Sequence, residues 1–205
     1  MIVGIILAAG SASRMGQAKQ LLPLGSRPML WHVAQAACQS RLDEVIVVTG
    51  AAVEPVSLCI ADLPLRIVHN PAWQQGQAGS IKTGLLALPP NCDAVLFLLA
   101  DQPLITSQLI NDLIGYWQRC GKSIVRPCHA NNPGNPVLFA LAAWRDALQQ
   151  LDGDQGARRI LKAHPEAIGY LPVANDEIFL DVDTIEDYAK MQQRFAMGAL
   201  NNSDC

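Results

Sequence analysis

Short runs of consecutive apolar residues alternate along this chain with segments in which apolar residues recur at helical spacing. The first run, residues 2–7, has no polar side chain, which is typical of a parallel strand covered on both faces. Further strands are predicted over residues 45–49, 66–69, 94–99 and 123–127, with helices over 29–39, 56–61, 80–88 and 107–119 between them. This alternation predicts an α/β fold in which parallel strands are joined by right-handed crossovers.

The pattern changes after residue 127. A turn-rich segment, residues 131–136, precedes a short apolar run at 137–139 that we predict to be a strand. Helices are expected over 141–150 and 157–163, a strand over 177–181, and a last helix over 185–195 that is capped by Thr184, with Glu186 and Asp187 in its first turn. The second half is therefore predicted to be a small lobe on the substrate side, and residues 197–205 a flexible tail.

The first strand leads into a loop of small residues that ends in two cations. Residues 7–19 read LAAGSASRMGQAK, so Gly10 lies where a parallel strand ends, the edge at which α/β sheets bind ligands. Backbone N–H groups of such a loop can approach phosphate oxygens, and Arg14 and Lys19 can neutralise them. The loop therefore predicts a triphosphate cradle. The alternative is a tight strand-to-helix connection in which Gly10 and Gly16 only supply positive φ.

Composition narrows the function classes without choosing one. The chain has 205 residues, half of them apolar, which suits a single domain with a full core. A formal charge of −3 gives no general attraction for nucleic acid, so a phosphate ligand must be held by local cations. No apolar run approaches the roughly 18 residues that span a bilayer, and no basic leader precedes the first strand, so we expect a cytoplasmic protein without a membrane partner. The six cysteines form no C-x-x-C pair and are predicted to be reduced thiols.

Two aspartates are candidates for a magnesium site. Asp101 follows the predicted strand at 94–99, so its carboxylate is expected at the carboxyl end of a buried strand. Mg²⁺ favours one or two carboxylates completed by waters and phosphate oxygens. The later segment D-V-D offers Asp183 as the second ligand, with Asp181 as its alternative. A structural interpretation stays open for both, with Asp101 as a turn former and Asp183 as part of a helix cap.

The loop and four later motifs together resemble one family. Residues 7–19 match the L-A-A-G-x-S-x-R-M-G-x-x-K signature of nucleotidyltransferases that activate sugar phosphates, isoprenoid precursors and the molybdenum cofactor. Four later segments resemble motifs of the molybdenum cofactor cytidylyltransferase branch and follow the same order. They are Asn70-Pro71 with Gly76 and Ser80, A-D-Q-P at 100–103, G-D-Q-G-A-R at 153–158, and D-V-D-T-I-E-D at 181–187. By this resemblance, over about residues 2–190, the chain is identified as a member of the MobA-like NTP transferase family.

The resemblance implies both a fold and a reaction. The fold would be a Rossmann-like three-layer sandwich of the nucleotide-diphospho-sugar transferase type, one domain over residues 1–196, with a nucleotide-binding half over about 1–127 and an acceptor-side half over about 128–196. The reaction would transfer CMP from CTP to the phosphate of molybdopterin with Mg²⁺ as cofactor. A molybdenum hydroxylase apoenzyme would be the partner that receives the product.

The candidate site residues fall into four groups. Nucleotide contacts are expected from Leu7, Ala8, Ala9, Gly10, Ser11, Arg14, Lys19, Asn70, Gly76 and Ser80. The candidate catalytic residues are Lys19, Arg14 and Asp101, and the candidate metal ligands are Asp101 and Asp183. The resemblance places Gly134, Asn135, Asp154 and Arg158 at the acceptor, although Asn135 stands where close relatives often have histidine.

Two other functions stay open on the sequence alone. A CTP- or UTP-dependent transferase for another phosphorylated small metabolite could use a similar loop. A non-catalytic chaperone could keep the fold and deliver a molybdenum cofactor dinucleotide to a partner enzyme, although intact Lys19, Asp101 and Asp183 argue for catalysis. Pyrophosphate release from CTP on addition of molybdopterin would distinguish the three.

Overall fold

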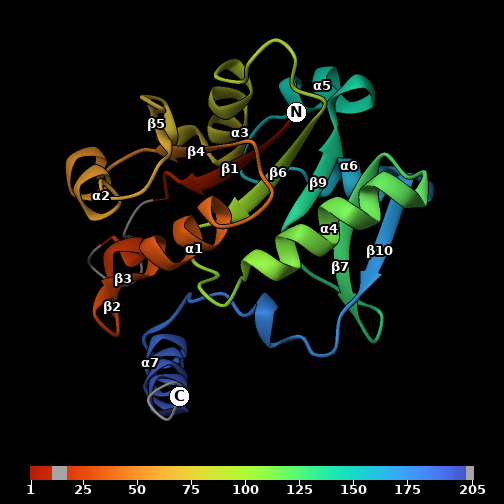
Figure 1. Ribbon diagram of the computed structural model, residues 1–205. Coiled ribbons are helices and arrows are strands. Elements are labelled where there is room, and N and C mark those ends of the chain that lie inside the picture. The colour runs from red at the N-terminus through yellow and green to blue at the C-terminus, as the bar shows by residue number, and fades with distance from the viewer. Residues whose placement is uncertain (11–17, 202–205) are drawn as a thin grey trace.

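The computed structural model describes residues 1–10 and 18–201, and side chains up to residue 196 (Figure 1). The strands of the main sheet are β1 (Ile2–Ala8), β4 (Glu44–Thr49), β5 (Arg66–His69), β6 (Ala94–Leu99), β7 (Ile124–His129), β8 (Asn132–Pro133), β9 (Val137–Ala140) and β10 (Ile168–Pro172). A separate antiparallel pair is formed by β2 (Pro23–Leu24) and β3 (Arg27–Pro28). The helices are α1 (Met29–Cys38), α2 (Val53–Cys59), α3 (Gln77–Leu86), α4 (Ser107–Cys120), α5 (Leu141–Gln149), α6 (Arg158–Ala163) and α7 (Ile185–Asn201), with 3-10 turns at Lys19–Leu21, Trp73–Gln75, Pro165–Ala167 and Glu177–Phe179.

The order of the strands indicates which edge of the sheet is suited to bind a ligand. It runs β10-β7-β9-β6-β1-β4-β5, with β8 paired to β7. β1 is parallel to both β4 and β6, whereas β9 is antiparallel to β6 and β7. After β1 the chain adds β4 and β5 on one side and then returns to add β6 on the other. The β1–β6 pair is therefore the topological switch point, where sheets of this kind bind ligands beyond the carboxyl ends.

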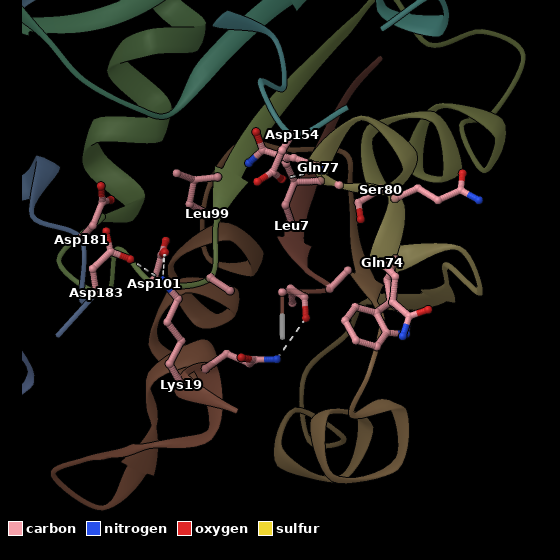
Figure 2. Close-up of a pocket in the computed structure, with 18 of the residues that line it drawn as sticks. Leu7, Lys19, Gln74, Gln77, Ser80, Leu99, Asp101, Asp154, Asp181 and Asp183 are labelled. Carbon is pink, nitrogen blue, oxygen red and sulfur yellow. Dashed lines mark hydrogen bonds and ion pairs between the residues drawn. The ribbon is translucent and has the colours of Figure 1, made fainter. Parts of the chain in front are cut away.

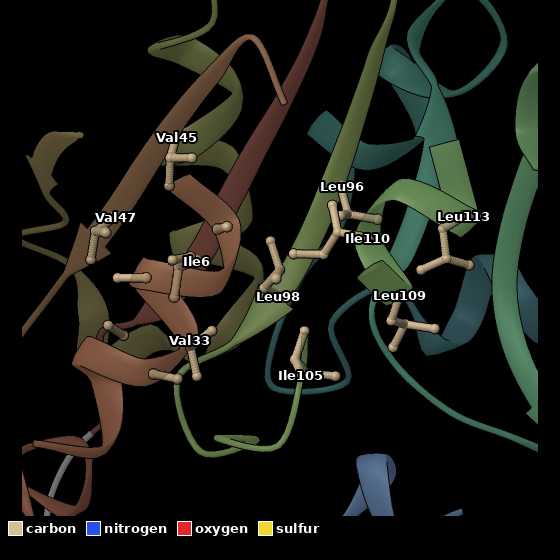
Figure 3. Packing of buried hydrophobic residues seen from close by; sticks show 14 of the residues in the cluster. Ile6, Val33, Val45, Val47, Leu96, Leu98, Ile105, Leu109, Ile110 and Leu113 are labelled. Carbon is tan, nitrogen blue, oxygen red and sulfur yellow. The ribbon is translucent and has the colours of Figure 1, made fainter. Parts of the chain in front are cut away.

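Helices cover both faces of the sheet, which makes three layers. α1 and α4 pack on one face, and α3, α5 and α6 pack on the other (Figure 1). Successive residues of one strand point to opposite faces, so Ile6 of β1 joins the first core and Ile5 joins the second. Figure 3 shows the first core, where Ile6 and Leu98 of the sheet meet Val33 of α1 and Leu109 of α4. Burial on both faces explains why the strands are continuous apolar runs.

A glycine lets α3 approach the sheet closely. A Cβ at Gly84 would lie 2.8 Å from Cγ2 of Ile5 on β1, nearer than side chains normally pack. Ile81 and Leu85, on the same helix, are almost fully buried against this face. The close fit fixes the position of α3, whose first turn points toward the carboxyl edge of β1.

The strands and helices predicted for the first half are confirmed, with shifts of a few residues at their ends. One expectation for the second half is wrong. Residues 177–181 form a 3-10 turn and a loop, and the last strand is β10, whose Gly169 and Pro172 weaken the strand signal. β9 enters the sheet antiparallel, because a turn rather than a crossover returns the chain beside β7.

The last helix begins where the sequence predicts. The backbone N–H of Asp187 donates to Oγ1 of Thr184 at 3.1 Å, and the N–H of Thr184 donates to Oδ2 of Asp187 at 3.1 Å. This reciprocal pair is a capping box, so the predicted Thr184 cap is confirmed. α7 continues to Asn201, beyond the expected end at residue 195.

Two negative observations apply to the described part of the chain. Its five cysteines are free thiols, as predicted. None of its helices combines the length and apolar character needed to cross a bilayer.

Candidate functional site

A cavity of about 940 Å³ opens at the carboxyl edge of the β1–β6 pair (Figure 2). Leu7 to Gly10 come from the end of β1, and Leu99 to Asp101 come from the end of β6. The remaining lining residues are Lys19, Gln20, Trp73, Gln74, Gln75, Gly76, Gln77, Ser80, Gly153, Asp154, Arg158, Asp181 and Asp183. The sheet topology thus gathers residues that are up to 176 positions apart (Leu7 and Asp183) around one space.

Lys19 lies at one end of this cavity between two carboxylates. Its Nζ donates to Oδ2 of Asp101 at 2.6 Å and to Oδ1 of Asp183 at 2.8 Å (Figure 2). The Asp101 side chain is 19% exposed and that of Asp183 is 50% exposed. Burial alone would lower the pKa of Lys19, but the charge and hydrogen bond of Asp101, followed by those of Asp183, outweigh it and raise the pKa. Lys19 is therefore a firmly protonated cation at this edge.

The segment that carries Asp183 is held directly against Asp101. The backbone N–H of Val182 donates to the carbonyl oxygen of Asp101 at 3.1 Å. Val182 itself is fully buried in a small core with Leu24, Met29 and Met191, so α7 and the β2–β3 pair anchor the segment. This anchoring explains how two aspartates 82 positions apart come to share one lysine.

The donor set fits a magnesium ion. Oδ1 of Asp101 is buried and has no hydrogen-bond partner, so one oxygen of this carboxylate is left unsatisfied. Among the described side chains, no group of three or more His, Cys, Asp or Glu residues is placed to hold a metal. A metal at Asp101 and Asp183 would therefore take its other ligands from water and phosphate oxygens, as Mg²⁺ commonly does.

Asp181 is a third carboxylate beside this pair. Its Oδ1 accepts a hydrogen bond from Nε2 of Gln102 at 2.7 Å. Partial burial raises the pKa of Asp181 to about 6, and the nearby negative charge of Asp101 is the second cause. Because Asp181 holds Gln102 and not Lys19, the geometry favours Asp183 over Asp181 as the partner of Asp101.

A buried glutamine, Gln20, contacts the backbone at the end of β1. Nε2 of Gln20 donates to the carbonyl oxygen of Ala8 at 3.2 Å, and Gln20 is 4% exposed. This bond ties the residue after Lys19 to the end of β1. Ser11 and Arg14, predicted to contact the nucleotide, lie outside the described residues.

Asn70 holds in place a segment that lines the cavity. Its side chain is 2% exposed; Nδ2 donates to Oγ of Ser80 at 3.1 Å, and Oδ1 accepts from the N–H of Ala72 at 3.0 Å. Ser80 lines the cavity, whereas Asn70 is not among the lining residues. The structure therefore places Asn70 as a brace for the 72–80 segment.

The first turn of α3 meets a loop from the second half of the chain. The N–H of Gln77 donates to Oδ1 of Asp154 at 3.2 Å, and the N–H of Ala78 donates to the carbonyl oxygen of Gly153 at 3.1 Å. Gly76 precedes this turn with φ of +99°, and a Cβ there would lie 2.7 Å from the Gly153 backbone. Asp154, expected at the acceptor, thus also caps a helix that lines the cavity.

The predicted acceptor residues do not all reach the cavity. Asp154 and Arg158 line it, whereas Gly134 and Asn135 do not. Gly134 packs directly beneath the ring of Phe179, which leaves no room for a side chain at that position.

Several lining residues were not singled out by sequence reasoning. They are Gln20, Trp73, Gln74, Gln75, Gln77 and Leu99. The signal for four of them was present, since W-Q-Q-G-Q directly follows the Asn-Pro motif. Gln20 follows the loop lysine and Leu99 ends an apolar run, so neither carries a chemical signal of its own.

A mostly parallel α/β sheet with a cavity at its switch point is an architecture of nucleotide-binding enzymes. A crystal structure of the Rv0371c homologue from Mycobacterium sp. strain JC1 superposes with a TM-score of 0.85 at 31% identity, over 96% of this chain and 97% of that one. Rv0371c from Mycobacterium tuberculosis H37Rv, in a structure described as a complex with manganese, superposes with a TM-score of 0.78 at 24% identity, over 94% of this chain and 98% of that one.

The sequence assigns the chain to one family of this class. The family model for the MobA-like NTP transferase domain matches residues 4–168, and the chain belongs to that family. Purine catabolism protein PucB of Bacillus subtilis is 31% identical over 91% of this chain and 94% of its own length. Molybdenum cofactor cytidylyltransferase of Escherichia coli is 27% identical over 93% of this chain and 95% of its own length. The family resemblance and the nucleotidyltransferase fold expected from the sequence are therefore confirmed.

Proposed function

We propose that this chain transfers CMP from CTP to the terminal phosphate of molybdopterin, in the cytoplasm. An oxygen of the acceptor phosphate attacks the α-phosphorus of CTP, and the bond between the α-phosphorus and its bridging oxygen breaks. Pyrophosphate leaves with the electron pair, and the product is molybdopterin cytosine dinucleotide. No protein nucleophile is needed, because phosphoryl transfer depends on positioning and charge stabilisation.

The observation that carries this proposal is the position of Lys19 between Asp101 and Asp183 at the switch-point cavity. A lysine whose pKa is raised stays protonated and can stabilise negative charge on the α-phosphate as the transition state forms. The backbone of residues 7–10 borders the same cavity, which supports its role as part of the triphosphate cradle. Arg14, outside the described residues, is proposed to neutralise the same triphosphate.

Asp101 and Asp183 are proposed to hold Mg²⁺, which when bound would neutralise phosphate charge. The unsatisfied Oδ1 of Asp101 supports this assignment. Lys19 now holds the other oxygen of Asp101 and one of Asp183, so its ammonium must be free to move from these carboxylates to the nucleotide. The flexible four-carbon stem of lysine suits such a transfer.

The acceptor is the most specific part of the proposal. The relative from Escherichia coli supports molybdopterin because it is named for the molybdenum cofactor. PucB, with a higher identity, is named for purine catabolism, so family membership alone leaves the acceptor open. A molybdenum hydroxylase apoenzyme is proposed as the partner that takes the product.

The test is pyrophosphate release by the purified protein with CTP, Mg²⁺ and molybdopterin. We expect stoichiometric pyrophosphate and a cytidine dinucleotide, with lower turnover when UTP, ATP or GTP replaces CTP. Pyrophosphate release only with a different phosphorylated acceptor would replace molybdopterin in the proposal. Tight binding of the finished dinucleotide without any pyrophosphate release would instead identify a chaperone.

A further inference from the structure

Arg126 is a cation that the sequence did not single out, and it lies on the sheet face covered by α6. Side chains alternate along β7: Ile124 belongs to the same core as Ile160 of α6, and Val125 belongs to the core on the opposite face. Arg126 therefore points to the α6 side, two residues nearer the carboxyl edge than Ile124. Arg158 begins α6, two residues before Ile160, and lines the cavity.

The hydrogen bonds of Arg126 use only part of its guanidinium. Nε donates to the carbonyl oxygen of Gly134 at 2.9 Å, and Nη2 donates to that of Pro133 at 3.2 Å. These bonds account for two of the five N–H donors of arginine, so three are left without a partner among the described residues. The remaining donors form part of a planar fork that suits a bidentate oxyanion.

The charge of Arg126 is also without an opposite charge. In the described part of the chain, no carboxylate oxygen lies within 4.0 Å of a nitrogen of Arg126 or Arg158. Burial lowers the pKa of Arg126; Tyr170 and Cys128 oppose this shift, and the positive charge of Arg158 adds to it. A half-buried guanidinium that donates to carbonyl oxygens and has no carboxylate partner is stabilised when an anion binds.

We propose that Arg126 and Arg158 together bind a tetrahedral oxyanion, and that this anion is the phosphate group of the acceptor. The assignment of the source rests on the proposed function. Arg158 lines the same cavity as Lys19 and the β1 edge, so the two cation sets would hold the two reacting phosphates separately. Arg126 also fixes the 133–134 turn, which gives that turn a role at the acceptor even though it does not line the cavity.

The first experiment titrates the full-length protein, labelled with ¹⁵N-arginine, with inorganic phosphate at constant ionic strength. The Nε–H signal of Arg126 is assigned by its loss in Arg126→Lys. We expect this signal to shift saturably with phosphate and not with chloride. In Arg158→Gln, which removes one charge-assisted contact, the affinity for phosphate should fall about tenfold. Arg159→Gln is the matched control, because it removes the same charge from the next, exposed residue of α6 and should leave the affinity unchanged.

An absence of any phosphate-dependent shift would overturn the subsite, and so would full phosphate affinity in Arg158→Gln. Both outcomes are read from the wild type and a surface substitution, so they do not depend on whether an Arg126 variant folds.

The second experiment identifies the source of the anion by repeating the titration with saturating CTP and Mg²⁺. Phosphate that still binds at Arg126 supports an acceptor subsite, and Arg126→Gln should then raise the KM for molybdopterin about tenfold while the KM for CTP is unchanged. Displacement of phosphate by CTP would overturn the acceptor assignment in favour of the nucleotide. If CTP fails to bind at all, the proposed function fails, while the phosphate titration still tests the subsite.

Discussion

The switch-point end of the cavity and the proposed Arg126 site differ in how their positive charges are balanced. At the switch-point end, which we call the balanced end, Lys19 is paired with both Asp101 and Asp183, so carboxylates already offset its positive charge before any ligand arrives. At the Arg126 site, the guanidinium donates to two carbonyl oxygens and has no carboxylate partner among the described residues. A ligand at the balanced end must exchange existing ion pairs for new ones, whereas a ligand at the Arg126 site adds the missing partner. The first arrangement suits a cation that changes partner during a reaction, and the second suits binding.

The balanced end is connected to the second half of the chain through α3. Its first turn lines the cavity, and its backbone N–H groups are held by Gly153 and Asp154 from the second half of the chain. A displacement of the 153–154 loop would therefore act directly on the first turn of α3.

Removal of the Asp101 carboxylate should have the largest effect on turnover. Asp101→Ala takes away one proposed metal ligand and one partner of Lys19. We expect turnover, measured as pyrophosphate release, to fall about 10³-fold. The protein should stay folded, because Lys19 keeps Asp183 as its partner.

Asp62→Ala is the matched control for this prediction. Asp62 is half exposed and forms an ion pair with Arg27 at 3.0 Å, and it is not among the cavity residues. Turnover of this variant should equal that of the wild type. Near-normal turnover of folded Asp101→Ala would remove the metal assignment and leave the two sites without a functional contrast.

Lys19→Ala should distinguish the role of the lysine cation from that of its two carboxylate partners. We expect turnover to fall about 10²-fold, because one stabilising contact to the transferring phosphate is lost. Affinity for Mn²⁺, measured by electron paramagnetic resonance without nucleotide, should be unchanged or higher, because Asp101 and Asp183 no longer hold the ammonium. A loss of Mn²⁺ affinity comparable with that of Asp101→Ala would mean that Lys19 organises the carboxylates and does not compete with the metal.

The sequence predicts the balanced end much better than the Arg126 site. The apolar runs that become β1 and β6 are unambiguous, and the parallel-sheet rule alone brings residues 7–10 and Asp101 to one edge. Magnesium chemistry and the family resemblance suggest the D-V-D segment as a partner of Asp101, but its position could not be derived from the sequence, because the contact between Val182 and Asp101 depends on tertiary packing.

The proposed acceptor site could not be assembled from the sequence for two physical reasons. β9 turns back antiparallel, and β10 is an edge strand with a weak pattern, so the neighbours of β7 were not predictable from alternation. Arg126 lies within an otherwise ordinary strand, and its lack of a carboxylate partner is a property of the folded surroundings. The predicted strand at 177–181 shows the opposite error, since its apolar residues pack in a 3-10 turn and a loop.

Gly76→Ala should test the connection through α3. The residue has φ of +99°, and the new Cβ would lie 2.7 Å from backbone atoms of Gly153 that cannot move aside easily. We expect the free energy of unfolding to fall by about 2–3 kcal/mol and the KM for CTP to rise, because the first turn of α3 must shift.

Gly156→Ala is the comparison for that variant. It also replaces a glycine with positive φ, but the nearest obstacle is the end of the flexible Gln77 side chain. Its cost should be about 1 kcal/mol, with the KM for CTP less affected than in Gly76→Ala. Equal effects of the two substitutions on KM would show that backbone contact between Gly76 and Gly153 does not position α3. Chemical denaturation and initial rates provide both measurements.

The smallest effect should come from Asp181, the third carboxylate at the balanced end. Its folded-state pKa of about 6 lies above the usual value of 3.8, so the folded protein holds this proton more tightly than the unfolded chain. Between about pH 4 and pH 6 the unfolded chain loses the proton first, and the free energy of unfolding falls as pH rises.

Asp181→Asn removes the ionisation and keeps an oxygen that can accept from Gln102. Relative to the wild type, this variant should gain about 1 kcal/mol above pH 6, after allowance for solvent screening, and nothing below pH 4. Urea denaturation at several pH values with a metal chelator measures the difference, and a stability difference independent of pH would mean that Asp181 is ionised throughout and adds to the carboxylates that balance Lys19.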